Sequence, residues 1–412
     1  MPTVKVIIIG CGIAGPVIAL LLKRKGYEPV ILEKVKELGD AGASLMMCPN
    51  GLKVLSLLEI GRCITESATH LEVLCESNFG GDVLGVSDLP SKYPQKYGQP
   101  AFGVKRTTLN LALKDALKAD NIKVHEGWKL KDIMENEDSV TAVSETGEKV
   151  VGSFLIGCDG IKAISRLVIL KKHGAEEEEA SYTGLTQTAG MSPTPLSVNS
   201  PRTMLNIYGP GAHFICYPVS PTTTSWAITQ RNRNASHETW KLFSPSELNA
   251  NRSQLLDTFK DWCSPVPELI GQADRIIKYG LYDRPQLESY QWYSIGGRCV
   301  LVGDAAHPTS PHLGQGANQA LEDCYHLSRV LPDVADGDRM STDVLRKAFE
   351  TFARSRQPRT AALVKGARAQ GELRVCDGDV DACTERDSVI RNRWKNVVAV
   401  EANFDSLYKE PF

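Results

Sequence analysis

The pattern of apolar positions at the start of the chain predicts a strand–helix–strand unit. Residues 6–9 form an uninterrupted run of β-branched side chains, as in a buried parallel strand. Apolar residues at helical spacing follow from residue 13 to about residue 25, and Gly26 ends this predicted helix. A second apolar run at residues 29–32 completes the unit, and a further helix is expected at residues 52–58.

The pattern changes in the middle of the chain, where apolar and polar side chains alternate. This alternation extends from about residue 182 to residue 230 and is clear at residues 213–217. Gly and Pro separate the alternating runs, so we expect an antiparallel sheet that is distinct from the first layers. Residues 246–275 and most of the chain after residue 303 are expected to be helical.

The first predicted strand ends in a turn of the form G-x-G-x-x-G. Gly10 permits the tight turn, Gly12 lets a pyrophosphate approach the backbone, and Gly15 lets the helix pack closely on the strand. Glu33 follows the second strand, where a carboxylate accepts hydrogen bonds from the ribose of an adenosine, which favours FAD or NAD over NADP. The alternative is a structural turn that binds no ligand. The predicted contacts of this first site are Gly10, Gly12, Ile13, Ala14, Gly15, Glu33 and Lys34.

A second strand–loop–helix pattern lies near the other end of the chain. The apolar run at residues 299–302 leads into Gly303-Asp304, and a loop rich in Pro and Gly continues to a helix that begins near Gly316. A helix N-terminus carries about half a positive charge, so it suits an anion or the electron-rich edge of a ring. We therefore expect both ends of the chain to build one nucleotide site.

The domain organisation follows from these two patterns. Residues 1–75, 102–180 and 285–335 are expected to form a discontinuous nucleotide-binding domain. Residues 76–101 and 181–284 are expected to form an inserted substrate-binding domain, and residues 336–412 a C-terminal helical segment. The predicted fold class is α/β, with a Rossmann-like domain, an inserted antiparallel sheet and a helical C-terminus.

Composition limits the class of protein but adds no site. With 412 residues, 42% hydrophobic residues, 23% charged residues and a net charge of −2, the chain is typical of globular proteins and indicates no nucleic-acid partner. The 11 cysteines include no C-x-x-C pair, which indicates a reducing compartment, and no metal site is predicted. The apolar runs are too short to cross a bilayer, so we expect a cytoplasmic protein without a stable membrane anchor.

These motifs give the chain a family likeness over essentially its whole length. It resembles the class A FAD-dependent monooxygenases, or aromatic hydroxylases, which include salicylate, p-hydroxybenzoate and urate hydroxylases and a fungal biosynthetic branch. Residues 158–160 with Arg166 are similar to the family's DG motif, and residues 303–316 to its GD motif. Ala163 stands where the DG motif has Ser, and Ser165 lies two positions later. The resemblance implies further FAD contacts from Gly42, Ser44, Arg106, Asp159, Asp304, Gly314, Gly316 and Ala317.

The resemblance also implies an activity. NADH or NADPH would reduce FAD, and a flavin C4a-hydroperoxide formed with O₂ would hydroxylate or epoxidise an electron-rich lipophilic or aromatic small molecule, in secondary metabolism or aromatic catabolism. The chain contains no second G-x-G-x-x-G for a nicotinamide cofactor, so the choice between NADH and NADPH stays open. Two alternatives remain: a flavin-dependent oxidase or reductase on the same scaffold, and a flavin-binding protein without turnover.

The inserted sheet is expected to cover the flavin and to supply the substrate contacts. Alternation puts His213 and Tyr217 on one face of strand 212–219, and Trp226 and Gln230 on one face of strand 224–230. The register between the strands stays open, and a slip of one residue exchanges the faces. The catalytic candidates are Tyr217, His213 and Pro311, and the substrate-binding candidates are Tyr217, Trp226, Gln230 and His312. The alternative is that Tyr217, His213 and Gln230 only pack within the sheet domain.

Overall fold

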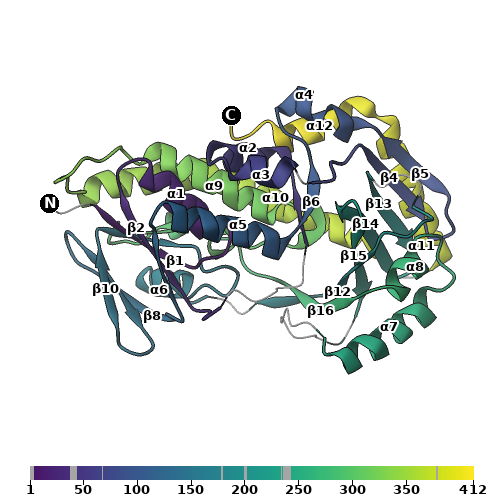
Figure 1. Cartoon of the computed structure of the whole chain (residues 1–412), viewed down its shortest axis with the longest axis horizontal. Helices are drawn as coiled ribbons and strands as arrows, with labels where there is room; N and C mark the ends of the chain where they lie inside the picture. The colour runs from purple at the N-terminus through teal and green to yellow at the C-terminus, as the bar shows by residue number, and fades with distance from the viewer. Residues whose placement is uncertain are drawn as a thin grey trace.

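The computed structural model describes most of the chain, and its two large sheets occupy opposite ends of the long axis (Figure 1). The described residues are 4–37, 44–66, 68–177, 180–198, 202–232, 234, 243–376 and 379–412. Gly42, one of the predicted FAD contacts, lies outside them.

A five-stranded parallel sheet forms the nucleotide-binding end. Its strands lie in the order β17-β11-β1-β2-β7. Their bounds are β1 Lys5–Ile9, β2 Glu28–Glu33, β7 Lys123–Glu126, β11 Phe154–Gly157 and β17 Cys299–Leu301. Because β17 pairs with β11 and β11 with β1, all in parallel, the carboxyl ends of these strands lie on the same side of the sheet. The two motifs from opposite ends of the chain therefore meet there, as expected.

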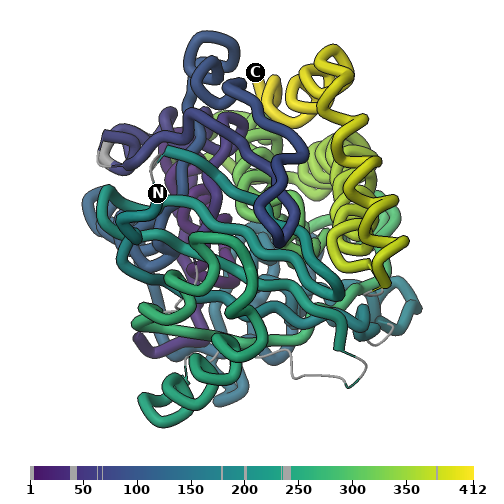
Figure 2. The backbone as a smooth tube through the Cα atoms, turned by 90° about the vertical axis from the view of Figure 1, so that its right-hand side faces the viewer, coloured from purple at the N-terminus to yellow at the C-terminus, as the bar shows by residue number. Residues whose placement is uncertain are grey.

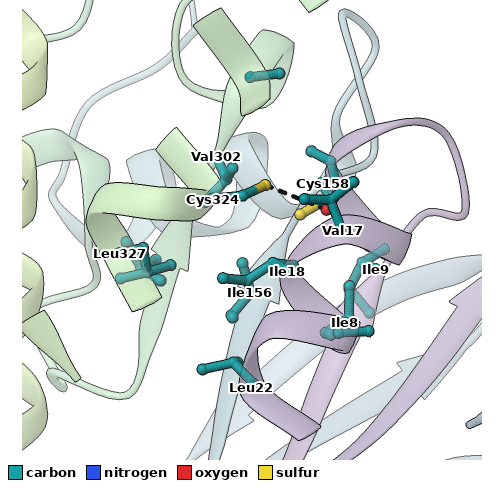
Figure 3. Packing of buried hydrophobic residues seen from close by; sticks show 14 of the residues in the cluster. Ile8, Ile9, Val17, Ile18, Leu22, Ile156, Cys158, Val302, Cys324 and Leu327 are labelled. Atoms are coloured by element: carbon teal, nitrogen blue, oxygen red, sulfur yellow. Dashed lines mark hydrogen bonds between the residues drawn. The ribbon is translucent and has the colours of Figure 1, made fainter. Parts of the chain in front are cut away.

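Helix α1 (Ala14–Lys23) and helix α9 (Gly316–Val330) pack against each other on this sheet. Figure 3 shows Val17 and Ile18 of α1 beside Ile156, with Cys324 and Leu327 of α9 facing them. All five side chains are buried, and burying a side chain of this size contributes about 1.5–3 kcal/mol. This packing fixes the start of α9 relative to the glycine-rich turn that precedes α1.

Smaller elements surround the parallel sheet. A two-stranded pair joins β3 (Ser44–Met47) and β6 (Phe102–Lys105), and a three-stranded antiparallel sheet has the order β10-β9-β8. The bounds of these three strands are β8 Leu130–Glu135, β9 Val140–Ser144 and β10 Lys149–Gly152. The helices of this region are α2 Pro49–Leu57, α3 Ile60–Glu66, α5 Arg106–Ala119 and α6 Ile164–Lys172, with single-turn helices η1 Ser289–Trp292, η2 Gly303–Ala305 and η3 Pro311–Leu313.

The second large sheet has seven strands in the order β16-β12-β15-β14-β13-β4-β5. Their bounds are β4 Val73–Asn78, β5 Val83–Ser87, β12 Ser181–Pro193, β13 Thr203–Gly209, β14 Ala212–Ser220, β15 Thr223–Arg231 and β16 Arg275–Asp283. The strands expected to be antiparallel, β12 to β16, pair as expected, and the sheet is extended by β4, which pairs in parallel with β13. Helices α7 (Pro245–Phe259) and α8 (Val266–Gly271) pack over one face of this mixed sheet. Helix α4 (Leu89–Tyr97) follows β5 in the chain and precedes β6.

The chain ends in long helices, as the fold class predicts. They are α10 Thr342–Arg374, α11 Val380–Lys395 and α12 Val397–Tyr408. Figure 2 shows α11 and α12 in yellow at the upper right, and α11 packs on the mixed sheet, where Ile390 meets Leu84 and Tyr208. In the part of the chain that the structure describes, no helix has the length and apolar character needed to cross a bilayer.

Candidate active site

The three glycines of the first turn have different environments. Gly10 has φ +99°, and a Cβ added there would lie 2.5 Å from the carbonyl oxygen of Cys158. A Cβ added at Gly15 would lie 2.0 Å from the carbonyl oxygen of Gly10, so α1 packs on the turn through bare backbone. A Cβ added at Gly12 would meet no atom within 4 Å. The backbone at Gly12 is therefore open to a ligand, which fits the pyrophosphate of a dinucleotide.

Glu33 lies beside this turn, at the end of β2. Its Oε2 accepts a hydrogen bond of 2.6 Å from the amide of Cys11, and its Oε1 one of 2.8 Å from the amide of Val35. Glu33 is half-buried and Lys34 is exposed. An acidic group next to the open backbone of Gly12 has the chemistry that ribose hydroxyls require. Ile13 and Ala14 carry the first amides of α1 at the same place.

The DG loop at the end of β11 and the GD loop at the end of β17 are joined by Arg166. The Arg166 guanidinium donates to the carbonyl of Ala306 at 3.1 Å and to that of Pro285 at 2.8 Å. Within the DG loop, the carboxylate of Asp159 accepts from both the amide and the hydroxyl of Ser165. Ser165 thus ties the loop to the first turn of α6 from its displaced position, and contact of Asp159 with FAD stays a prediction.

Asp304 lies in the GD loop. Among the three carboxylates predicted to contact the cofactor, it is the only one that accepts no hydrogen bond from a described residue. Solvent reaches it, yet desolvation by the surrounding protein raises its pKa, and the charges of His307 and then Arg106 act in the opposite direction. A Cβ added at Gly316, the first residue of α9, would lie 3.9 Å from Asp304 Oδ1. An acceptor beside a helix N-terminus and an arginine suits the polyhydroxylated, anionic chain of a flavin nucleotide.

The start of α9 is held against β3 by Asn318. The Asn318 side chain donates to the carbonyl oxygens of Met46 at 2.9 Å and Gly314 at 2.8 Å, and accepts from the amide of Cys48 at 3.0 Å. Gly314 has φ +62°, a left-handed conformation that favours glycine. The amides of Gly316 and Ala317 are consequently presented at a fixed place, where they fit the electron-rich edge of a flavin ring.

A buried ion network behind the GD loop keeps it in position. Asp323 accepts from the amide of Gly303 at 3.0 Å, from His307 at 2.5 Å and from Arg356 at 2.7 Å. Burial opposes ionisation, but the charges of His307 and Arg356 outweigh it and hold the pKa of Asp323 well below its usual range. Arg356 also pairs with Glu322 at 2.6 Å. The loop that carries Asp304 is thus fixed by charges of α9 and α10.

The register of the mixed sheet decides which predicted substrate residues share a face. Tyr217 pairs with Ser225, and His213 pairs with Thr229, so these four side chains lie on one face. The Tyr217 hydroxyl lies 2.8 Å from the Ser44 hydroxyl, which lies 2.6 Å from that of Ser225. Ser44, a predicted FAD contact, therefore meets the same face of the sheet as Tyr217.

The structure does not bring Trp226 and Gln230 to that face. Trp226 pairs with Cys216 and lies on the opposite face, where it stacks on Phe214 with ring centroids 6.0 Å apart. Its indole N–H donates to Ser192 at 2.9 Å. Trp226 therefore contributes to the core beneath α7 and α8 rather than to the lining beside Tyr217, and Gln230 shares its face.

The two predicted histidines lie close to helix α10. His312 is buried against Gly371, where an added Cβ would lie 2.5 Å from its Nε2, and Pro311 before it is exposed. His213 is fully buried, with its Nε2 3.1 Å from Asn206 Oδ1. Burial, reinforced by the charge of Arg374, lowers the pKa of His312 to about 3 and that of His213 well below its ordinary value. Both rings are therefore neutral at physiological pH.

Sequence reasoning missed several polar residues of this face. Tyr279 of β16 donates to Gln187 of β12, and Gln187 donates to Thr229 at 3.3 Å. Burial, with a smaller effect of Tyr217, raises the pKa of Tyr279, and the charge of Arg106 opposes this. No local motif marks these positions, because they come together only through the pairing of β12 with β15 and β16. Among the described residues, no group of three or more His, Cys, Asp or Glu is arranged to hold a metal ion.

This combination of a glycine-rich turn, an acidic strand end and a GD loop at one sheet edge defines a flavoprotein. A model of the FAD binding domain family matches residues 3–367, and the chain belongs to this family. It is a class A FAD-dependent monooxygenase, as the resemblance implied. The predicted cofactor and fold class are confirmed with it.

Curated relatives match over nearly the whole chain. 3-amino-4-hydroxybenzoate 2-monooxygenase of Streptomyces cremeus is 28% identical over 393 residues, covering 94% of this chain and 92% of the relative. 3-hydroxybenzoate 6-hydroxylase of Klebsiella oxytoca is 27% identical, covering 90% and 88%. Salicylate hydroxylase of Pseudomonas putida is 26% identical, covering 90% and 86%. These three organisms are bacteria, so the fungal branch stays a prediction.

Solved structures share the fold. That of HpxO of Klebsiella pneumoniae, complexed with FAD and uric acid, superposes with a TM-score of 0.84 at 23% identity and covers 99% of this chain and 97% of that chain. CtdE, complexed with FAD and a substrate, superposes with a TM-score of 0.75 at 18% identity, covering 97% of this chain and 100% of that chain. Identities this low show the fold alone.

Proposed function

We propose that the chain hydroxylates a small aromatic substrate on the face of the mixed sheet that carries Tyr217, with NADH or NADPH as reductant and O₂ as oxygen source. The observation that supports this most is the contact of Ser44 with Tyr217 and Ser225, because it joins that face to the FAD-binding end. The relatives are named for 3-amino-4-hydroxybenzoate, 3-hydroxybenzoate and salicylate, and HpxO was solved with uric acid. All four are small ring compounds that are rich in electrons.

FAD, when bound, supplies the electron transfer and the activation of oxygen. In this proposal the chain holds it through the two motifs and their neighbours. The proposed contacts are Gly10, Gly12, Ile13, Ala14, Gly15, Glu33, Lys34, Gly42, Ser44, Arg106, Asp159, Asp304, Gly314, Gly316 and Ala317. The mixed sheet excludes water from the reacting ring, since activated oxygen is lost to water in an open site.

His213 is proposed as the acceptor for a substrate hydroxyl. Asn206 Oδ1 already accepts from Arg374 at 3.3 Å, so it acts as an oxygen acceptor toward His213 as well, and the ring proton lies on Nε2. That tautomer leaves Nδ1 as an acceptor, and this atom is buried without a partner in the described part of the chain. When a phenolic O–H of the substrate donates a hydrogen bond to Nδ1, the aromatic ring of the substrate becomes richer in electrons. This favours its attack by an electrophilic oxygen.

Tyr217 is proposed as the second orienting group. Burial raises the pKa of its hydroxyl, and Ser44 and Ser225 oppose this only in part, so the hydroxyl keeps its proton at neutral pH. A protonated tyrosine both donates and accepts, which suits an oxygen substituent of an aromatic ring. Pro311 and His312, in the loop that leads to Gly314, complete the proposed lining.

The test is oxygen incorporation from ¹⁸O₂. Purified holoenzyme receives NADPH or NADH and a panel of hydroxybenzoates, aminohydroxybenzoates and urate, and the products are analysed by mass spectrometry. The proposal predicts one labelled oxygen in the product and faster nicotinamide oxidation with substrate than without. Reduced but unlabelled product would instead support a reductase, and absence of any stimulation would support a flavin-binding protein without turnover. The Tyr217→Phe variant, with its FAD content measured, is the matched control for the substrate face.

A further inference from the structure

Arg374, the last residue of α10, places a positive charge next to this substrate face. Its terminal nitrogen donates to Asn206 Oδ1 at 3.3 Å, and Asn206 belongs to β13 of the mixed sheet. Its Nε is buried and has no hydrogen-bond partner in the described structure. No carboxylate of the described residues forms an ion pair with it, although desolvation makes its charge costly and lowers its pKa.

The neighbouring arginines of α11 are paired, which makes Arg374 an exception. Arg386 forms an ion pair with Asp387 at 2.8 Å, and Arg393 forms one with Glu76. Glu76 also accepts from Trp394 at 2.6 Å and from the Tyr208 hydroxyl at 3.1 Å, so its oxygens are already engaged. The cluster therefore carries one more positive charge than it has carboxylates to balance. A buried charge of this kind needs an anionic partner.

Two further buried polar atoms point to a ligand at the same place. Nδ1 of His213 and Nδ1 of His312 have no partner in the described structure, and the two side chains are 0% and 4% exposed. His213 shares the acceptor Asn206 Oδ1 with Arg374, and His312 lies against Gly371, one turn before Arg374 on α10. Buried polar atoms are almost always hydrogen-bonded in proteins, so three unpaired ones in one cluster indicate polar groups of a bound molecule.

We infer that Arg374 binds an anionic group of the substrate, namely a carboxylate on its aromatic ring, and so sets the class of substrate from the C-terminal helical segment. The inference rests on the proposed function for the identity of the ring. A guanidinium forms short, charge-assisted hydrogen bonds to a carboxylate, and such bonds contribute about 1.5–3 kcal/mol each. That range corresponds to a preference of about 10- to 100-fold for a carboxylate over a neutral amide of the same shape.

The experiment compares ring carboxylates with their amides. Benzoate and benzamide, 3-hydroxybenzoate and 3-hydroxybenzamide, and salicylate and salicylamide are titrated into holoenzyme, and binding is read from the absorbance change of bound FAD. The wild type is expected to prefer the carboxylate in at least one pair by about 10-fold or more. Arg374→Gln should abolish that preference, and Arg374→Lys should keep part of it. Arg368→Gln is the control, because Arg368 lies on the same helix, is exposed and pairs with Asp283 and Glu372.

Two results would overturn the inference. One is a wild type that binds both members of every pair equally or binds none of them. The other is a variant Arg374→Gln that keeps its FAD and the full preference for the carboxylate. Because binding is measured without nicotinamide cofactor, a preference for carboxylates is detected even in a protein that incorporates no oxygen. Failure of the inference is thus distinguishable from failure of the proposed function.

Discussion

Replacing glycines of the first turn by alanine should separate cofactor binding from folding. At Gly15 an added Cβ would lie 2.0 Å from a backbone oxygen, well inside the 3.4–4 Å of ordinary contact. A backbone oxygen cannot rotate away, so Gly15→Ala should destabilise the apoprotein by about 3 kcal/mol, at the upper end of the usual cost of overpacking. At Gly12 the same methyl group meets no atom within 4 Å, and φ is not positive. Gly12→Ala should therefore leave the apoprotein as stable as the wild type, or more stable by about 0.4–1 kcal/mol.

Binding of FAD, in contrast, should be weakened by the Gly12→Ala substitution. The methyl group of Gly12→Ala occupies the open backbone where the pyrophosphate is expected, and hydrogen bonds to charged groups contribute about 1.5–3 kcal/mol. FAD affinity should fall about 10- to 100-fold in that variant. Urea unfolding of the apoproteins measures stability, and quenching of flavin fluorescence on titration measures affinity. A Gly12→Ala variant that loses as much apoprotein stability as Gly15→Ala, or that binds FAD as tightly as the wild type, would contradict this prediction.

Three more perturbations test other parts of the site. Asp304→Ala should weaken FAD binding strongly without loss of apoprotein stability, because no described residue bonds to this carboxylate; full FAD occupancy after dialysis would count against the placement of the GD loop. Tyr217→Phe should keep the FAD content and lower the fraction of nicotinamide oxidation that yields hydroxylated product, measured as product per NADPH consumed; unchanged coupling would make Tyr217 a packing residue. Arg356→Met should cost about 3–5 kcal/mol in urea unfolding near neutral pH. Since the pKa of Asp323 is depressed, its stabilising contribution is complete above its ordinary value of about 3.9 and is lost as the pH falls below that, so the wild type should lose more stability on acidification than Arg356→Met.

The cofactor end of the protein was predictable because its signals are local. The turn from Gly10 to Gly15 and the strand end at Glu33 need only neighbours in sequence to define their geometry, and the structure keeps the predicted order of strand, helix and strand. The strand–loop–helix pattern at residues 299–316 also predicts that the GD loop joins this unit, and β17 does pair with β11 of the same sheet. Ser165, two positions after the place of the motif's Ser, donates two hydrogen bonds to Asp159, which the sequence alone did not indicate.

The substrate face was predictable only in part because it depends on pairing between distant strands. Alternation within β14 correctly predicts that Tyr217 and Phe214 lie on opposite faces. The register of β14 with β15 is not encoded in the local pattern, and this register places Trp226 opposite Cys216, in the core. The parallel pairing of β4 with β13 reflects a long crossover that periodicity does not encode. Arg374 is separated from its partner Asn206 by 168 positions, and only the docking of α10 on the sheet shows that its charge lacks a carboxylate.

The stoichiometry of FAD in the purified protein tests the central claim most directly, namely that the turn at Gly10 and the loop at Asp304 hold a single flavin. The absorbance spectrum of the protein, before and after reconstitution with added FAD, gives the ratio of cofactor to chain. The account predicts one FAD per chain, and a ratio that falls in Gly12→Ala and in Asp304→Ala. A colourless protein that takes up no FAD on reconstitution would contradict it.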